Sequence, residues 1–127
     1  ERLNQEIIDK GEHFPYMNGK VVFVHAIKKM SQTVETVLKK AEISKSEVGC
    51  YLFHQANLRI NQKVQETLGL ADEQVFNTIQ KYGNTTAATI PIGLADALKE
   101  GKIKRGDYVV LAAFGSGFSW GSIILKY

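Results

Sequence analysis

Three short polar strings interrupt apolar segments of the chain, and each carries residues capable of chemistry. They are HQAN at residues 54–57, GNTT at 83–86 and GSG at 115–117. The imidazole of His54, with an ordinary pKa of about 6.5, can act as an acid, a base or a hydrogen-bond donor. The carboxamide of Asn84 can donate a hydrogen bond without carrying charge. Two such donors aimed at one oxygen would stabilise an enolate or oxyanion, by roughly 3–4 kcal/mol per donor.

Each string also has an ordinary structural interpretation. His54 could be a satisfied histidine at the edge of the core, Asn57 could be the N-cap of a following helix, and Asn84 could be a turn residue. The glycines of 115–117 could bring backbone N–H groups close to a ligand, or they could form a plain hairpin loop. Residue types and spacing alone leave these alternatives open.

The elements that would position these strings follow from hydrophobic periodicity. Apolar residues at spacings of three and four predict a helix over 20–41, and the string SKSE at 44–47 predicts a capping box. The apolar run 49–53 predicts a buried strand that ends directly at HQAN. A second helix is predicted over 58–68, with Gly69 as its stop.

The second half of the chain continues the alternation. Residues 71–79 predict a short turn followed by a strand, and 87–99 predict a third helix. Thr85 or Thr86 could cap that helix, and Pro91 falls near its first turn. Strands are then predicted over 108–114 and 118–125, joined by the glycine loop.

This order of elements predicts an α/β architecture, a mixed sheet covered by helices. The buried strands carry few charges, so helices are expected on both faces of the sheet. Ligands of such sheets bind outside the carboxyl ends of the strands, so the three polar strings could line one pocket. Residues 1–18, which lack periodicity, are expected to be a residual linker and turn segment, and 19–127 the folded domain.

Composition excludes several classes. The 127 residues carry a net charge of only +3, without a basic patch interleaved with aromatics, so no nucleic-acid partner is expected. No apolar run has the length of a membrane span, and residues 1–6 do not resemble a signal peptide. The lone cysteine, Cys50, fits a reducing cytoplasm and, within a predicted buried strand, is expected to behave as a small hydrophobe. No metal and no cofactor are expected.

Three motifs in order resemble those of the ketoacyl-ACP synthase III family. FHQANLRI at 53–60 is similar to the family's HQAN-x-R-I signature, and GNTTAATIP at 83–91 is similar to its GNT[ST]AA[ST]-x-P segment. FGSGFSWGS at 114–122 is similar to its FG-x-G-[FL]-[ST]WG segment. The match runs from about residue 15 to Tyr127. Ser116 stands where the family often has a third glycine.

The resemblance implies the C-terminal half of a thiolase-like fold and an acyltransferase of fatty acid biosynthesis. Such enzymes join an acyl-CoA primer to malonyl-ACP by decarboxylative Claisen condensation, with a Cys–His–Asn triad. By motif position His54 and Asn84 are the His and Asn, while the nucleophilic Cys belongs to the N-terminal half. Cys50 does not match that cysteine, so the chain alone is expected to be inactive.

Other roles are implied with the same resemblance. The backbone N–H of Ser116 would contribute to an oxyanion hole, and Phe114 would lie beside the reactive thioester in the acyl pocket. Arg59 resembles the arginine that meets the acyl carrier protein. Positions near the pantetheine arm of coenzyme A are matched by Met17, Gly19, Phe23 and Asn57.

The implied partners are acyl carrier protein, a coenzyme A thioester and a second copy of the full-length protein. The isolated chain is expected to self-associate, because a half that packs against a similar half would expose an apolar face. Two alternatives stay open. One is a non-catalytic domain that binds acyl-CoA or carrier protein, and the other is a related quinolone- or ester-forming synthase of the same fold.

Overall fold

The computed structural model describes residues 3–14 and 16–127, and its centre is a three-stranded mixed sheet. The strands are β1 (Val48–Phe53), β2 (Tyr108–Gly115) and β3 (Ser119–Lys126), in the order β1-β2-β3. β1 and β2 are parallel, whereas β2 and β3 are antiparallel. The prediction of a mixed sheet is therefore confirmed.

Side chains along β1 alternate between two hydrophobic clusters, as the period of two in a strand requires. Tyr51 and Phe53 lie in one cluster, and Cys50 and Leu52 lie in the other. All four side chains are at most 2% exposed. Both faces of β1 are thus buried, as the apolar run 49–53 predicted.

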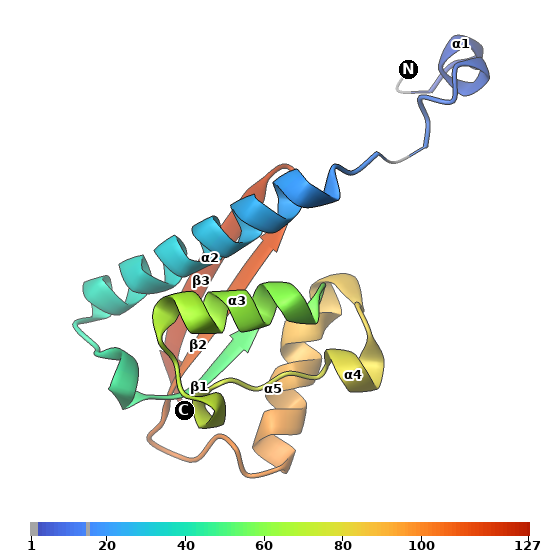
Figure 1. Ribbon diagram of the computed structural model, residues 1–127. Helices are drawn as coiled ribbons and strands as arrows, with labels where there is room; N and C mark the ends of the chain where they lie inside the picture. Colours follow the sequence, from blue (N-terminus) through green and yellow to red (C-terminus); the bar gives the residue numbers. More distant parts are fainter. Residues whose placement is uncertain (1–2, 15) are drawn as a thin grey trace.

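Two long helices cover one face of the sheet and a third covers the other. α2 (Gly19–Ala41) and α3 (Leu58–Leu68) contribute to the cluster around Tyr51, and α5 (Thr89–Lys99) contributes to the cluster around Leu52. Figure 1 shows α2 and α3 together over the sheet, with α5 apart from them. Each begins and ends close to the predicted bounds.

The remaining elements are short. The predicted capping box at 44–47 is present, since the Glu47 carboxylate accepts from the backbone N–H of Ser44 at 2.8 Å. In the described part of 1–18, residues 3–14 and 16–18, there is one short helix, which has no buried residue and which Figure 1 draws away from the sheet. The short elements are α1 (Gln5–Asp9), η1 (Lys45–Glu47), η2 (Asp72–Gln74), α4 (Ile79–Tyr82) and η3 (Thr86–Ala88).

The strand predicted within 71–79 is wrong. Only a single bridge, from Tyr51 to Val75, forms there, and α4 begins at Ile79. The backbone N–H groups of Thr78 and Ile79 donate to the side chain of Gln55. Those donors are therefore taken up by a side chain, and the segment turns into a helix instead of extending the sheet.

The capping role expected of Thr85 or Thr86 is also wrong. α5 starts at Thr89, and no side chain caps it. Thr86 instead adopts a positive φ of 54°, and its N–H donates to Asn84 Oδ1 at 2.9 Å. This tight turn separates the two threonines from the helix that they were expected to cap.

The predicted hairpin of β2 and β3 is present, with its register running from Tyr108 opposite Lys126 to Gly115 opposite Ser119. Gly117 in its loop has a φ of 140°, and a Cβ there would lie 2.7 Å from Ser119 Oγ. Glycine is therefore required at this position. Within the part of the chain that the structure describes, no helix is long and apolar enough to cross a membrane.

Candidate active site

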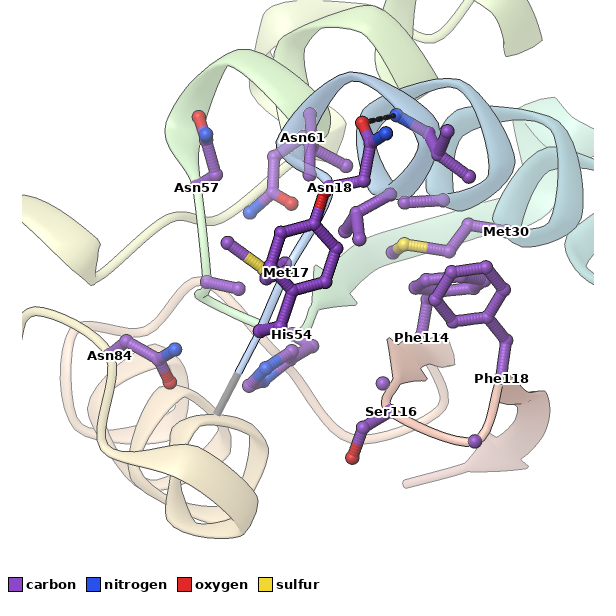
Figure 2. A pocket seen from close by; sticks show the side chains of 18 residues that line it. Met17, Asn18, Met30, His54, Asn57, Asn61, Asn84, Phe114, Ser116 and Phe118 are labelled. Atoms are coloured by element: carbon purple, nitrogen blue, oxygen red, sulfur yellow. Dashed lines mark hydrogen bonds between the residues drawn. The ribbon is translucent and has the colours of Figure 1, made fainter. Parts of the chain in front are cut away.

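A cavity of about 660 Å³ opens where the carboxyl ends of β1 and β2 meet the start of α2 and α3. His54 follows β1, Phe114 lies near the end of β2, and Asn84 comes from the loop before α5. Figure 2 shows these side chains around one space, with Ser116 on the glycine loop beside them. The structure thus brings the three polar strings of the sequence together.

A second cavity of about 540 Å³ lies on the other side of the same residues. His54, Asn84, Phe114, Gly115 and Ser116 line both cavities. Atoms placed between the two spaces would therefore contact the histidine, the asparagine and the glycine loop at once.

His54 is held by a hydrogen bond to the first residue of α5. Its Nδ1 lies 2.6 Å from Thr89 Oγ1, and Thr89 is 3% exposed. Among the described residues Nδ1 is the one hydrogen-bond partner of this buried hydroxyl. If the hydroxyl accepted from Nδ1–H, its own O–H would be left unpaired, so donation from the O–H to Nδ1 is the favoured direction. His54 is then the Nε2–H tautomer, whose remaining N–H is free to donate.

Burial lowers the pKa of His54 below its ordinary value. The start of α5 lies beside the ring, and the positive end of a helix dipole also disfavours an imidazolium. Both effects keep the ring neutral near pH 7. A neutral Nε2–H donor suits a developing oxyanion.

The lowered pKa predicts a pH dependence of stability. The unfolded chain, with a His54 pKa of about 6.5, binds a proton more readily than the folded chain does. This contribution to the free energy of unfolding is complete above that value and is lost as the pH falls through the folded pKa. Urea midpoints measured at about pH 7.5 and pH 5.5 should therefore fall further for the wild type than for His54→Gln. Equal pH dependence of the two proteins would contradict the assignment.

Asn84 is oriented by its own loop. Its Oδ1 accepts the N–H of Thr86, so its Nδ2 group remains to donate. The loop follows the last turn of α4, which is anchored to α5 because Tyr82 OH and Lys81 Nζ each lie 2.9 Å from Asp96 Oδ2. The site therefore presents two amide- or imidazole-type donors and, among the residues described, no cluster of ligands that could hold a metal ion.

Gln55 connects the histidine strand to the asparagine loop. It is 2% exposed, and its Oε1 accepts the N–H groups of Thr78 and Ile79 at 3.0 and 3.1 Å. These are the first N–H groups of α4, so Gln55 caps that helix from a different segment. The side chain after His54 in sequence thereby fixes the helix that leads to Asn84.

The other predicted site residues fall into two groups. Met17 and Asn57 line the first cavity, and Asn57 Oδ1 also accepts the N–H of Arg59 as the N-cap of α3. Among the residues described, Arg59, Gly19 and Phe23 line neither cavity. The roles assigned to these five positions stay predictions.

Three residues of the site were not predicted from the sequence. They are Thr89, Gln55 and Asn61. Thr89 and Gln55 stand inside the motifs at 83–91 and 53–60, and that place was the only signal for them. Asn61 is fully buried on α3 and lines the first cavity. A polar residue on the apolar face of a predicted helix was its signal.

Comparison with known proteins gives one consistent family. Residues 38–127 match the family model described as 3-oxoacyl-[acyl-carrier-protein (ACP)] synthase III C terminal. The beta-ketoacyl-[acyl-carrier-protein] synthase III of Koribacter versatilis is 44% identical over 98% of this chain and 37% of its own length. That of Aquifex aeolicus is 46% identical over 87% of this chain and 36% of its own length.

Solved structures agree. The synthase III of Aquifex aeolicus superposes with a TM-score of 0.86 at 46% identity, over 88% of this chain and 36% of that one. The synthase III of Thermus thermophilus gives a TM-score of 0.86 at 38% identity, over 88% of this chain and 35% of that one. OleA of Xanthomonas campestris, at 20% identity and a TM-score of 0.79, shares the fold alone.

The sheet, its covering helices and the converging polar loops therefore define the C-terminal half of a thiolase-like domain. The chain belongs to the 3-oxoacyl-[acyl-carrier-protein] synthase III family, as the three motifs predicted. It spans little more than a third of the length of the curated relatives it matches.

Proposed function

We propose that this chain is the C-terminal part of an enzyme that condenses an acyl-CoA primer with malonyl-ACP at the start of fatty acid synthesis. The observation that carries the proposal is the position of His54 and Asn84, which both line the two cavities. Each side chain also has a nitrogen that bonds to no other described residue and can donate. Family membership supports the reaction class. The chemistry below uses these two donors.

In the first half-reaction, the acyl group moves from coenzyme A to a cysteine thiolate in the N-terminal part of the protein, and the coenzyme A thiolate leaves. In the second, the bond between the malonyl methylene and its carboxylate breaks and carbon dioxide is released. The electron pair forms an enolate, whose oxygen accepts hydrogen bonds from His54 Nε2–H and Asn84 Nδ2–H. The enolate carbon then attacks the acyl thioester, and the cysteine thiolate leaves.

Cys50 does not supply that nucleophile. It is fully buried in β1, and burial raises the pKa of its thiol to about 11. Since the thiolate is the reactive form, Cys50 is inert near neutral pH. The chain alone, mixed with an acyl-CoA, should show no covalent acylation by mass spectrometry, whereas the full-length protein should gain one acyl group. Acylated Cys50 would overturn this division of the site.

Acyl carrier protein and a coenzyme A thioester are the proposed partners, and the cytoplasm, where a lone buried cysteine stays reduced, is the proposed compartment. Arg59, exposed on α3, is the proposed contact for the acidic carrier protein. Homodimerisation of the full-length protein is proposed from the family resemblance.

Self-association of the isolated chain is supported by its exposed apolar side chains. Phe118, Trp120 and Ile123 of the β2–β3 hairpin are 42%, 46% and 60% exposed, and Val24 of α2 is 56% exposed. Sedimentation of the chain at tens of micromolar, roughly the range in which exposed apolar surfaces associate, should therefore show a species larger than a monomer. A single monomeric species would contradict this expectation.

A further inference from the structure

The first cavity contains a buried polar atom that the chemistry of His54 and Asn84 does not use. Asn61 is 0% exposed on the inner face of α3, and its Oδ1 has no hydrogen-bond partner among the residues described. Asn61 is one of the residues that line this cavity. Figure 2 shows its carboxamide pointing in the direction of Met17 and His54.

The orientation of that carboxamide is imposed by a chain of amides. Gln55 Oε1 accepts two backbone N–H groups, so Gln55 Nε2 is the donor toward the carbonyl oxygen of Phe53 at 2.7 Å and toward Asn77 Oδ1 at 3.3 Å. Asn77 Oδ1 also accepts from Asn61 Nδ2 at 2.9 Å. Backbone N–H groups can only donate, so each amide in the series has one allowed orientation. The series ends with the oxygen of Asn61, not its nitrogen, left unpaired.

A buried carbonyl oxygen without a hydrogen-bond partner lowers the stability of the fold. Most of its neighbours around the cavity are apolar, and a hydrocarbon chain placed there would leave the oxygen unpaired. A ligand with an N–H group would satisfy it. The apolar neighbours include Val21, Val22, Ala26, Met30 and Ile60.

We propose that Asn61 Oδ1 accepts a hydrogen bond from an amide N–H of the pantetheine-type arm that carries the acyl or malonyl thioester. The inference rests on the proposed function, which supplies a ligand whose arm contains two secondary amides. Asn61 is then a binding residue for the arm, at a distance from the reacting atoms. A neutral hydrogen bond that is lost with its acceptor left buried corresponds to about ten-fold in affinity.

The test compares S-acetyl-pantetheine with two analogues, in each of which one amide N–H is replaced by an ester oxygen. Binding is measured by calorimetry on the full-length protein that contains this chain. One of the two analogues should bind the wild type about ten-fold more weakly than the parent. In Asn61→Leu the parent should weaken by a similar factor, and that analogue should weaken no further.

Gln62→Ala is the matched control, because Gln62 is the exposed neighbour of Asn61 on α3. This substitution should leave the affinities for the parent and both analogues unchanged. If Asn61→Leu fails to fold, the two analogues on the wild type still decide the question. Equal binding of the parent and both analogues overturns the inference, and it means that Asn61 Oδ1 pairs only with water. Normal discrimination between the analogues, without decarboxylation of malonyl-ACP, would overturn the proposed function and leave the inference standing.

Discussion

Replacement of His54 by alanine in the full-length protein is expected to lower the rate of malonyl decarboxylation by about 100- to 1,000-fold. The loss removes an imidazole that lines both cavities, and among the described residues no other histidine lines either of them. Release of carbon dioxide from labelled malonyl-ACP measures this step apart from acyl transfer. A rate within a few-fold of the wild type would remove His54 from the mechanism.

Two further substitutions show whether the tautomer matters. Thr89→Val keeps the shape of the side chain but removes the hydroxyl that donates to Nδ1, so it should lower the rate less than His54→Ala does. Thr89→Ser keeps the hydroxyl and should restore most of the rate. Cys50→Ala is the control, because Cys50 lies in the cluster between β1 and α5 and lines neither cavity, and it should leave decarboxylation unchanged. If Thr89→Ser and Thr89→Val were equally impaired, the hydroxyl would have no role in orienting the ring.

Gln55→Ala is expected to lower the free energy of unfolding of the chain by roughly 2–4 kcal/mol. The substitution leaves the N–H groups of Thr78 and Ile79 without their acceptor, and it opens space beside the buried Phe53. Urea denaturation, monitored by circular dichroism, measures the change. The exposed Gln62→Ala should shift the value by no more than about 0.5 kcal/mol.

The same substitution should reduce decarboxylation in the full-length protein, although Gln55 lines neither cavity. The effect would arise because α4 loses its cap, and the loop that follows α4 and carries Asn84 then loses its fixed position. If Gln55→Ala and Gln62→Ala unfolded at the same urea concentration, the side chain would not hold α4.

The sequence predicted elements whose stability depends on local pattern. The stripe that includes Met30, Val34 and Leu38 predicted α2, and these side chains are indeed buried. The glycine loop predicted the β2–β3 hairpin. The three polar strings predicted one pocket, because strand ends at one edge of a sheet must lie together.

Features that depend on contacts between distant segments were not predicted. The strand expected near Val75 is reduced to a single bridge. The chain then enters α4 at Ile79, where Gln55, distant in sequence, accepts the backbone N–H groups of Thr78 and Ile79. The bond from His54 to Thr89 joins β1 to α5, and no local pattern indicates it. Arg59 shows the opposite case, since the motif includes it although it is exposed on α3 and, among the described residues, is not one that lines either cavity.

The parallel pairing of β1 with β2 has a consequence for how the chain folds. Everything from residue 54 to residue 107 lies between two strands that are neighbours in the sheet. Closing so long a loop lowers the entropy of the chain before the contacts between the two strands can form. This pairing is therefore expected to form slowly, and later than the local β2–β3 hairpin. His54, Asn84 and Thr89 all lie within that loop. A partly folded chain would therefore contain secondary structure but no site, and ligand binding would appear only with the last, rate-limiting step.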